Sequence, residues 1–241
     1  MSKISNVLSL KQAQDEKNLE KLNSEVSKLK HERKKFCEQA AKTLLRALDA
    51  KDNYTFGHSM RVAYYSLALG REYGLNEEEL YELELSALFH DIGKIGVPDS
   101  VLLKPSRLEE DEFLKMKKHP SLSYEILQDF DVFQEVAVYA KHHHERFDGR
   151  GYPDNLKGED IPLFSRIILI ADTFDAMTST RPYRKGLSYD IAFSELLEFS
   201  GSQFDPGLVQ VFIKAMSKEV LKNEETFHLS IIDGNFAKNA A

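Results

Sequence analysis

The sequence is poor in cysteine and has no long hydrophobic run. Cys37 is the single cysteine among 241 residues, so the chain forms no intrachain disulfide, and we expect a reducing, cytoplasmic environment. The longest apolar runs are about five residues, such as IILIA at 167–171, whereas a membrane-spanning helix needs about 20. The first residues also lack the apolar stretch of a signal peptide. We therefore expect neither secretion nor a membrane span.

An excess of basic residues is also absent. The formal net charge is −7, which argues against broad binding to a nucleic-acid polymer or an anionic membrane but leaves room for a small basic pocket. Hydrophobic residues make up 42% of the chain, enough for one domain of ordinary size with an appendage.

The first 50 residues contain neither proline nor glycine, which predicts a long helix. We assign residues 1–42 to this N-terminal helical segment. Its apolar residues follow a heptad pattern that Arg33 interrupts, which is typical of a coiled coil and predicts a homodimer. A solvated helix leaning on its own domain is the alternative. The heptad residues are Leu19, Leu22, Val26, Leu29 and Phe36.

Residues 43–222 have the pattern of an all-α domain, and residues 223–241 resemble a loose tail. The β-branched run RIILIAD at 166–172 fits a helical face, so we expect a buried helix there. Punctuation residues predict the helix ends. The predicted signals are a break over 52–57, a stop at Gly74, capping boxes at Asn76 with Glu79 and at Ser106 with Glu109, a stop at Pro120 and a start at Asp205-Pro206.

Six of the eight histidines lie between residues 58 and 144. Four of them continue the apolar stripe of a different predicted helix: His58, His90, His119 and His143. The stripe before His119, for example, consists of Phe113 and Met116. A lone histidine in such a place is usually a hydrogen-bonded core residue. Four together, with Asp91 beside His90 and Asp172 on a fifth apolar helix, favour a metal centre, because buried imidazoles are costly unless they are paired or ligated.

The available ligands are imidazoles and carboxylates, with no thiolate cluster. This excludes a zinc-finger type of site and favours a hydrolytic centre with iron, manganese, zinc or another first-row metal. Asp91 could bridge two ions, with His58 and Asp172 completing one and His119 with the histidines at 142–144 completing the other. Two ions about 3.5–4 Å apart activate a hydroxide and stabilise the charges of phosphoryl transfer.

Long motifs in the sequence resemble those of the HD-GYP family. They include HDIGKIGVPD (90–99), HHERFDGRGYP (143–153) and RPYR (181–184), and the similarity runs from about Leu44 to about Val220. The resemblance implies an HD-domain helical bundle extended by HD-GYP helices, a centre of two or three metals, and cyclic dinucleotide substrates, chiefly cyclic di-GMP.

The resemblance also implies roles for individual residues. One metal-ligand set is His58, His90, Asp91 and Asp172, and the ligands added for the second metal are His119, His143 and His144. Asp91 and Lys94 are the expected catalytic residues, and the expected substrate-binding residues are Lys94, Arg181, Arg184 and Tyr152. His142 lies outside the family motif. Glu145 and Asp175 are candidates for orienting ligand histidines, although a salt bridge from Asp175 to Arg181 or Arg184 is an equal alternative.

One position departs from the family pattern. Members with three metals carry a glutamate one helical turn before the first histidine ligand, and this chain has Tyr54 there. We therefore expect two divalent ions per chain, iron or manganese first and zinc, nickel or cobalt as alternatives. The resemblance implies hydrolysis of cyclic di-GMP to pGpG, with GMP as a further product, by metal-activated hydroxide. Alternatives are cyclic GMP-AMP, a mononucleotide, or a signalling module that binds partners, for which the GYP loop (Gly151-Tyr152-Pro153) is a candidate surface.

Overall fold

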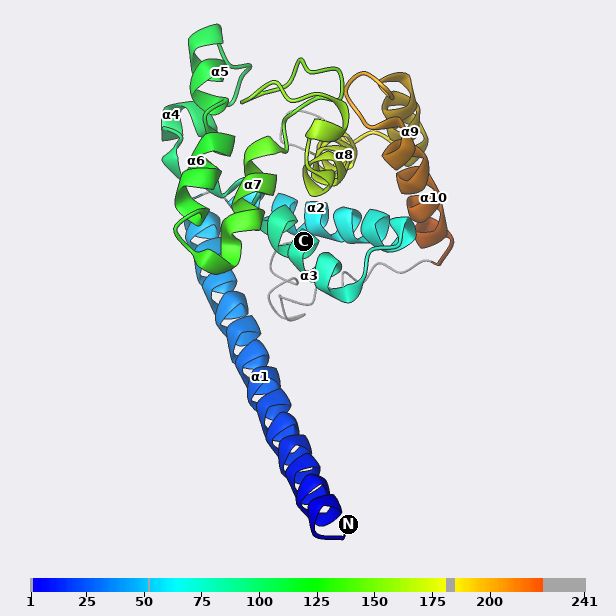
Figure 1. Cartoon of the computed structure of the whole chain (residues 1–241). Coiled ribbons are helices and arrows are strands. Elements are labelled where there is room, and N and C mark those ends of the chain that lie inside the picture. The colour runs from blue at the N-terminus through cyan, green and yellow to red at the C-terminus, as the bar shows by residue number, and fades with distance from the viewer. Residues whose placement is uncertain (1, 52, 181–184, 223–241) are drawn as a thin grey trace. The chain divides into compact units, whose positions relative to one another are not determined.

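The computed structural model describes residues 2–51, 53–180 and 185–222 (Figure 1). The chain divides into two units, Met1–Ala41 and Lys42–Ala241. Throughout these described ranges the structure consists of helices and loops, with an isolated β-bridge between Ser200 and Phe204 and no strand. The all-α prediction is confirmed. Within the same ranges, no helix has both the length and the apolar character required to cross a bilayer.

The N-terminal helix α1 covers Ser2–Lys51, so the predicted long helix is confirmed. The heptad residues of α1 all have exposed side chains: Leu19 58%, Leu22 56%, Val26 44%, Leu29 65% and Phe36 55%. Their exposure leaves an apolar stripe on a polar helix.

The last residue of α1 is fixed to the domain. The ammonium of Lys51 donates to the carbonyl oxygens of Ile95 and Val97, at 2.7 and 3.0 Å, and lies 3.2 Å from a carboxylate oxygen of Asp99. This places the end of α1 against the segment that follows the His90-Asp91 pair.

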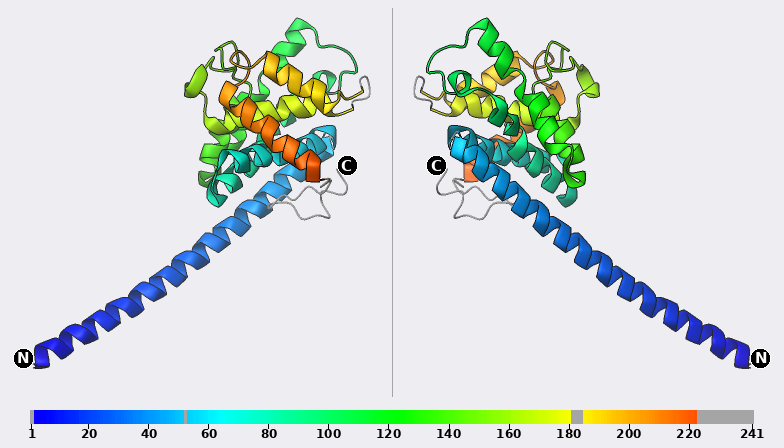
Figure 2. Two further views of the ribbon diagram at one scale, coloured as in Figure 1. Left: turned by 90° about the vertical axis from the view of Figure 1, so that its right-hand side faces the viewer. Right: turned by 90° about the vertical axis from the view of Figure 1, so that its left-hand side faces the viewer.

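The domain packs around α2 and α8. Helix α2 contacts α3, α8 and α10, and α7 contacts α3, α6 and α8 (Figure 2 shows α10 against α2). The α-helices are α2 (Asn53–Tyr73), α3 (Glu77–Phe89), α4 (Asp99–Leu102), α5 (Glu110–Met116), α6 (His119–Leu127), α7 (Gln134–His142), α8 (Leu163–Thr178), α9 (Tyr189–Glu198) and α10 (Pro206–Lys222). The 3-10 helices of the described ranges are η1 (Ile92–Gly96), η2 (Asp131–Phe133) and η3 (Gly158–Asp160).

Several predicted helix ends are confirmed. The Asn76 side chain accepts hydrogen bonds from the N–H groups of Glu78 and Glu79 and closes a capping box at the start of α3. The Asp205 side chain accepts hydrogen bonds from the N–H groups of Gly207 and Leu208 and so caps α10, which begins at Pro206. The run at 166–172 lies in α8, where Ile167, Ile168, Ile170 and Ala171 are fully buried, as predicted.

Other predicted ends are wrong or only partly right. The first helix ends where the break was predicted, at Lys51, but residues 53–57 belong to α2, which begins at Asn53. The capping box predicted at Ser106 forms three residues later, where Glu112 accepts the N–H of Glu109 and pairs with Lys104.

Pro120 does not end a helix but lies in the first turn of α6. Proline is tolerated there, because the first turn needs no N–H donor. His119 therefore begins α6 and does not close the preceding helix.

Candidate metal centre

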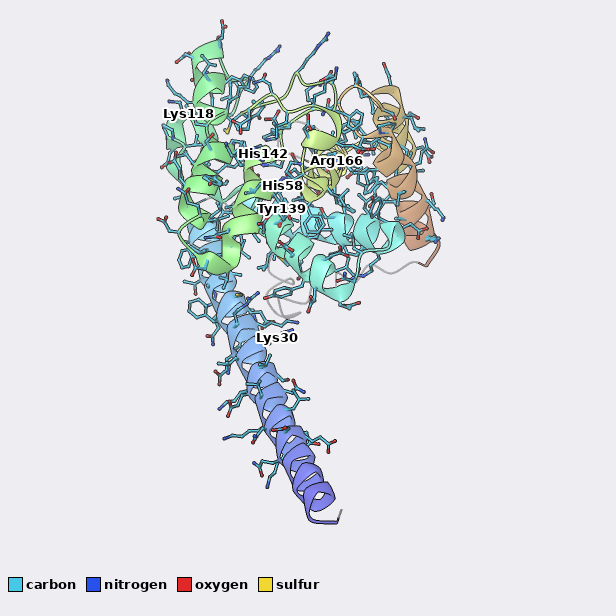
Figure 3. All side chains as sticks on the ribbon, in the orientation of Figure 1. Lys30, His58, Lys118, Tyr139, His142 and Arg166 are labelled. Carbon is cyan, nitrogen blue, oxygen red and sulfur yellow. The ribbon has the colours of Figure 1, made fainter. Side chains whose placement is uncertain are left out.

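The predicted ligands come from the ends and middles of different helices and meet inside the domain. His58 lies on α2, His90 and His143 follow the last residues of α3 and α7, His119 begins α6, and Asp172 lies on α8. Figure 3 labels His58 and His142 among the side chains of this region. These four histidines and Asp91 are buried. Asp172 and the remaining predicted ligand, His144, are half-buried.

His119 reaches the site by a route that the sequence did not predict. Its supposed stripe is not a buried face, because Phe113 is 48% exposed. The position at the start of α6 directs His119 inward, and its Nδ1 donates to the carbonyl of Met116 at 2.8 Å. The structure brings His119 to the other candidate ligands, as the prediction requires, but not through the apolar stripe from which it was predicted.

Three histidines are held by the same local hydrogen bond. The Nδ1 atoms of His90, His119 and His143 lie 2.6, 2.8 and 2.6 Å from the carbonyl oxygens of Ala87, Met116 and Ala140. A carbonyl oxygen only accepts, so each Nδ1 carries the hydrogen. In the neutral ring, Nε2 then keeps its lone pair, which is the form that binds a metal.

Asp91 connects two groups of ligands through its two carboxylate oxygens. Oδ1 lies 3.2 Å from Nε2 of His119 and 4.0 Å from Nε2 of His143. Oδ2 lies 3.3 Å from Nε2 of His90 and 3.8 Å from Nε2 of His58. One carboxylate therefore faces both groups, as a bridging ligand would.

The donor atoms fit a metal centre better than a hydrogen-bonded core. Among the described residues, Nε2 of His90 is buried and has no hydrogen-bond partner. The Nε2 atoms of His119 and His143 lie 3.3 Å apart, and with both Nδ1 atoms protonated, two neutral rings would direct lone pairs at each other. A cation removes both conflicts. In the described part of the chain, three sets of side chains place ligand atoms close enough to share an ion: His119, His143 and His144; His58, His90 and Asp172; and His90, Asp91 and His143.

The protonation of Asp91, His143 and His144 also suits metal binding. Burial alone would raise the pKa of Asp91, but Lys94 and His90 hold that pKa well below its usual range. Burial and the neighbouring His119 lower the pKa of His144 to about 3, and burial with His144 lowers the pKa of His143. An ionised carboxylate and neutral imidazoles are the forms that bind metal.

His58 is oriented by Asp175. Its Nδ1 lies 2.6 Å from one carboxylate oxygen of Asp175, and the guanidinium of Arg61 donates to the other at 2.6 Å. Burial lowers the pKa of His58, but the carboxylates of Asp172 and Asp175 outweigh it and raise the pKa to about 9. Asp175 therefore contacts a candidate ligand. Arg61 was not predicted as a site residue, although it lies three residues after His58 on α2 and therefore on the same helix face.

Lys94 and Tyr152 lie at this centre. The Lys94 ammonium is 2.5 Å from Oδ2 of Asp91. The Tyr152 ring lies 4.9 Å from the His144 ring, at an angle of 31°. Burial and the Asp172 and Asp91 carboxylates raise the pKa of the Tyr152 phenol.

His142 and Glu145 hold the GYP loop through Asp154, the residue that follows it. The side chain of His142 therefore contacts the loop and belongs to none of the candidate ligand sets. His142 Nε2 lies 3.0 Å from Asp154, and Glu145 accepts the N–H of Asp154 at 2.6 Å. The Glu145 carboxylate thus fixes the loop, and among the described residues this carboxylate has no hydrogen bond to a histidine. Gly151 allows a close approach, since a Cβ at this position would lie 2.3 Å from the backbone nitrogen of Arg146. Arg181, Arg184 and the side chain of Tyr54 lie outside the described residues.

Known proteins with similar sequences share this domain. The model of the HD domain family matches residues 42–208. A protein of Xanthomonas campestris named cyclic di-GMP phosphodiesterase response regulator RpfG is 42% identical over 177 residues, which cover 73% of this chain and 47% of that protein. A cyclic di-GMP phosphodiesterase of Thermotoga maritima is 40% identical over 74% of this chain and 50% of its own length.

A further relative and a solved structure are also similar to this chain. A protein of Vibrio cholerae named 3'3'-cGAMP-specific phosphodiesterase 3 is 38% identical over 71% of this chain and 37% of its own length. The structure of Bd1817, an HD-GYP-type protein of Bdellovibrio bacteriovorus, shares the fold with a TM-score of 0.57 at 22% identity, covering 80% of this chain and 64% of that one. The chain thus belongs to the HD domain family. It spans about half the length, or less, of these curated relatives.

Proposed function

We propose that this chain is a metal-dependent phosphodiesterase that hydrolyses cyclic di-GMP. The observation that carries the proposal is the position of Asp91, whose two carboxylate oxygens each face a different group of imidazoles. Such a bridge is the central element of a two-metal hydrolytic site. The relatives named as cyclic dinucleotide phosphodiesterases support the substrate class.

The described side chains divide into two ligand groups around Asp91. His58, His90 and Asp172 would hold one ion, and His119, His143 and His144 the other. Two bound divalent ions, preferably iron or manganese, would lower the pKa of a water molecule and stabilise charge on phosphoryl oxygens. We propose two ions, because position 54, one turn before His58 on α2, carries a tyrosine whose phenol is a poor substitute for a carboxylate.

Other residues act on the substrate. Lys94, whose ammonium lies beside Asp91, would balance the negative charge that develops on the phosphate. Tyr152 would form one wall of the site beside His144. We assign Arg181 and Arg184 to phosphate binding, because guanidinium groups match phosphate oxygens.

The chemistry is hydrolysis of one phosphodiester. An oxygen atom from water forms a bond to phosphorus, the bond from phosphorus to a ribose oxygen breaks, and that oxygen takes up a proton. The product of one cleavage is linear pGpG, and a second cleavage gives GMP.

Metal removal should abolish turnover. Chelated protein is expected to hydrolyse no cyclic di-GMP, and Mn²⁺ or anaerobic Fe²⁺ should restore hydrolysis, because imidazole and carboxylate ligands bind these ions. Chromatography of the products gives the rate, and metal analysis gives the stoichiometry. The restored protein should also unfold at a higher temperature. Restored metal binding without hydrolysis of any cyclic dinucleotide would contradict the proposed activity.

Cyclic GMP-AMP is the second candidate substrate, because relatives from Vibrio cholerae carry names specific for it. The metal ligands contact phosphate and do not read bases. The ratio of kcat/KM for the two dinucleotides, measured on the same metal-loaded sample, decides between them.

We also propose that α1 forms a homodimer through its exposed heptad stripe, and that the GYP loop is a contact surface for a signalling partner. Changing Leu22 and Leu29 together to Glu should convert a dimer to a monomer at tens of micromolar protein, because charges in an a/d seam cannot be buried. Light scattering gives the mass. Ser24→Glu, at an exposed position outside the stripe, is the matched control. A wild-type chain that is monomeric at that concentration would rule out the dimer.

A further inference from the structure

Lys117 lies beside Tyr152, which in turn lies beside a candidate metal ligand. It follows the last residue of α5, and its ammonium is 4.6 Å from the centre of the Tyr152 ring. The same ring lies 4.9 Å from the ring of His144, with only 31° between the two planes. Tyr152 therefore contacts both a lysine and a candidate metal ligand.

The charge of Lys117 is not neutralised by a carboxylate. Lys94, Lys104 and Lys141 each lie 2.5 or 2.6 Å from an acidic side chain. Lys117 is half-buried and forms no ion pair with any residue in the described part of the chain. Its ammonium instead lies over the faces of two aromatic rings, 4.6 Å from the centre of Tyr152 and 5.6 Å from the centre of Phe113. A cation over an aromatic face keeps much of its ability to attract an anion.

Stabilisation of α5 is the simpler explanation for a lysine at this position. A positive charge near the C-terminus of a helix is favourable, and any orientation of the side chain would provide it. Lys115 already supplies such a charge in the last turn, where it pairs with Asp111 at 3.0 Å. The Lys117 ammonium instead lies over Tyr152 of the GYP loop. Stabilisation of α5 does not require this particular orientation of the side chain.

We propose that Lys117 binds the second phosphate of a cyclic dinucleotide, the one that is not being hydrolysed, and that Tyr152 separates this cation from the metal centre. The inference rests on the proposed function. A cyclic dinucleotide carries two negative phosphates in one small ring, so a site that binds one of them at the metal ligands must accommodate the other nearby. Lys117 offers an uncompensated cation that one aromatic ring separates from the candidate ligand His144, and the neutral phenol of Tyr152 adds no opposing charge.

The test compares a substrate with two phosphates and a substrate with one. Lys117→Met keeps the length and apolar character of the side chain but removes its charge. With cyclic di-GMP, KM should rise about ten- to a hundred-fold, the range for losing a charged contact. With bis(p-nitrophenyl) phosphate, which has a single phosphate, kcat/KM should change at least ten-fold less. Lys117→Arg should recover most of the affinity for cyclic di-GMP.

The controls separate binding from structure. Lys118→Met, at the exposed neighbouring position labelled in Figure 3, should leave both substrates unaffected. Metal content and melting temperature of Lys117→Met should match those of the wild type. Equal losses on both substrates would overturn the inference and assign Lys117 to the support of Tyr152. An unchanged KM for cyclic di-GMP would also overturn it while leaving the proposed function intact. A wild type that neither binds nor hydrolyses a cyclic dinucleotide would overturn both.

Discussion

Asp91→Asn protein is expected to lose its bound metal and nearly all phosphodiesterase activity. The substitution keeps the size of the side chain but removes the charge that both imidazole groups face. Removing a residue that only hydrogen-bonds to a metal ligand typically lowers metal affinity about 10- to 100-fold. Removing a ligand that bridges two ions should therefore lower metal affinity by more than about 100-fold. Metal analysis after dialysis and the initial rate with cyclic di-GMP measure the two effects.

The fold of the Asp91→Asn protein should survive, which makes the result interpretable. Without metal, the buried Asp91 charge is compensated mainly by Lys94, and its removal leaves a neutral amide in the same space. Circular dichroism should therefore match that of the metal-free wild type. Asp129→Asn, at an exposed position on the loop after α6, is the matched control and should keep metal and activity. Normal metal content with normal turnover in Asp91→Asn would refute the bridging role.

Gly93→Ala should destabilise the domain and disturb the site together. A Cβ at position 93 would lie 2.0 Å from the carbonyl oxygen of His119 and 2.5 Å from the backbone nitrogen of Ser123. Both neighbours are backbone atoms at the start of α6, so neither can turn away as a side chain would. Overpacking of this kind costs about 1–3 kcal/mol, and the backbone contact places this case at about 3 kcal/mol or above.

The cost should appear as a melting temperature lowered by roughly 6–12 °C, given about 2–4 °C per kcal/mol for a domain of this size. Because His119 must move with its carbonyl, metal affinity should fall as well. Gly207→Ala is the control, since its Cβ would meet only a side-chain oxygen of Asp205 at 3.4 Å. In the first turn of α10, that change should be neutral or up to about 1 kcal/mol stabilising. An unchanged melting temperature for Gly93→Ala would show that α6 is not fixed by this contact.

Local patterns predicted much of the fold. Residues that cap or stop helices act on neighbouring backbone groups, so Asn76, Gly74 and Asp205 were assigned correctly from the sequence. The signals failed where a nearby alternative competed. Glu109 and Glu112 replaced Ser106 as the start of α5, because Glu112 both accepts a backbone N–H and pairs with Lys104.

The candidate ligands were also predicted from the sequence, but their arrangement was not. Apolar stripes placed His58 and His90 on buried faces, and the structure brings both to Asp91. The direction of His119 was not predicted correctly, because the first turns of α6 contact residues about 30 positions earlier in the chain, as in the hydrogen bond from the Gly93 N–H to the Ser123 hydroxyl. A helical period describes one helix and carries no information about how two helices meet.

The sequence by itself determined the helical class, the long N-terminal helix, the identity of the candidate ligands and the family. These follow from periodicity, capping and the order of motifs, which are properties of neighbouring residues. Only the tertiary structure decided that Asp91 faces two imidazole groups, that Asp175 and Arg61 orient His58, and that Lys117 lies over Tyr152. Asp175 lies 117 positions from His58 in the sequence. Such distant pairs depend on how whole helices pack against one another. That packing is set by the buried side chains and hydrogen bonds of the entire domain together, so a pattern of neighbouring residues cannot predict it.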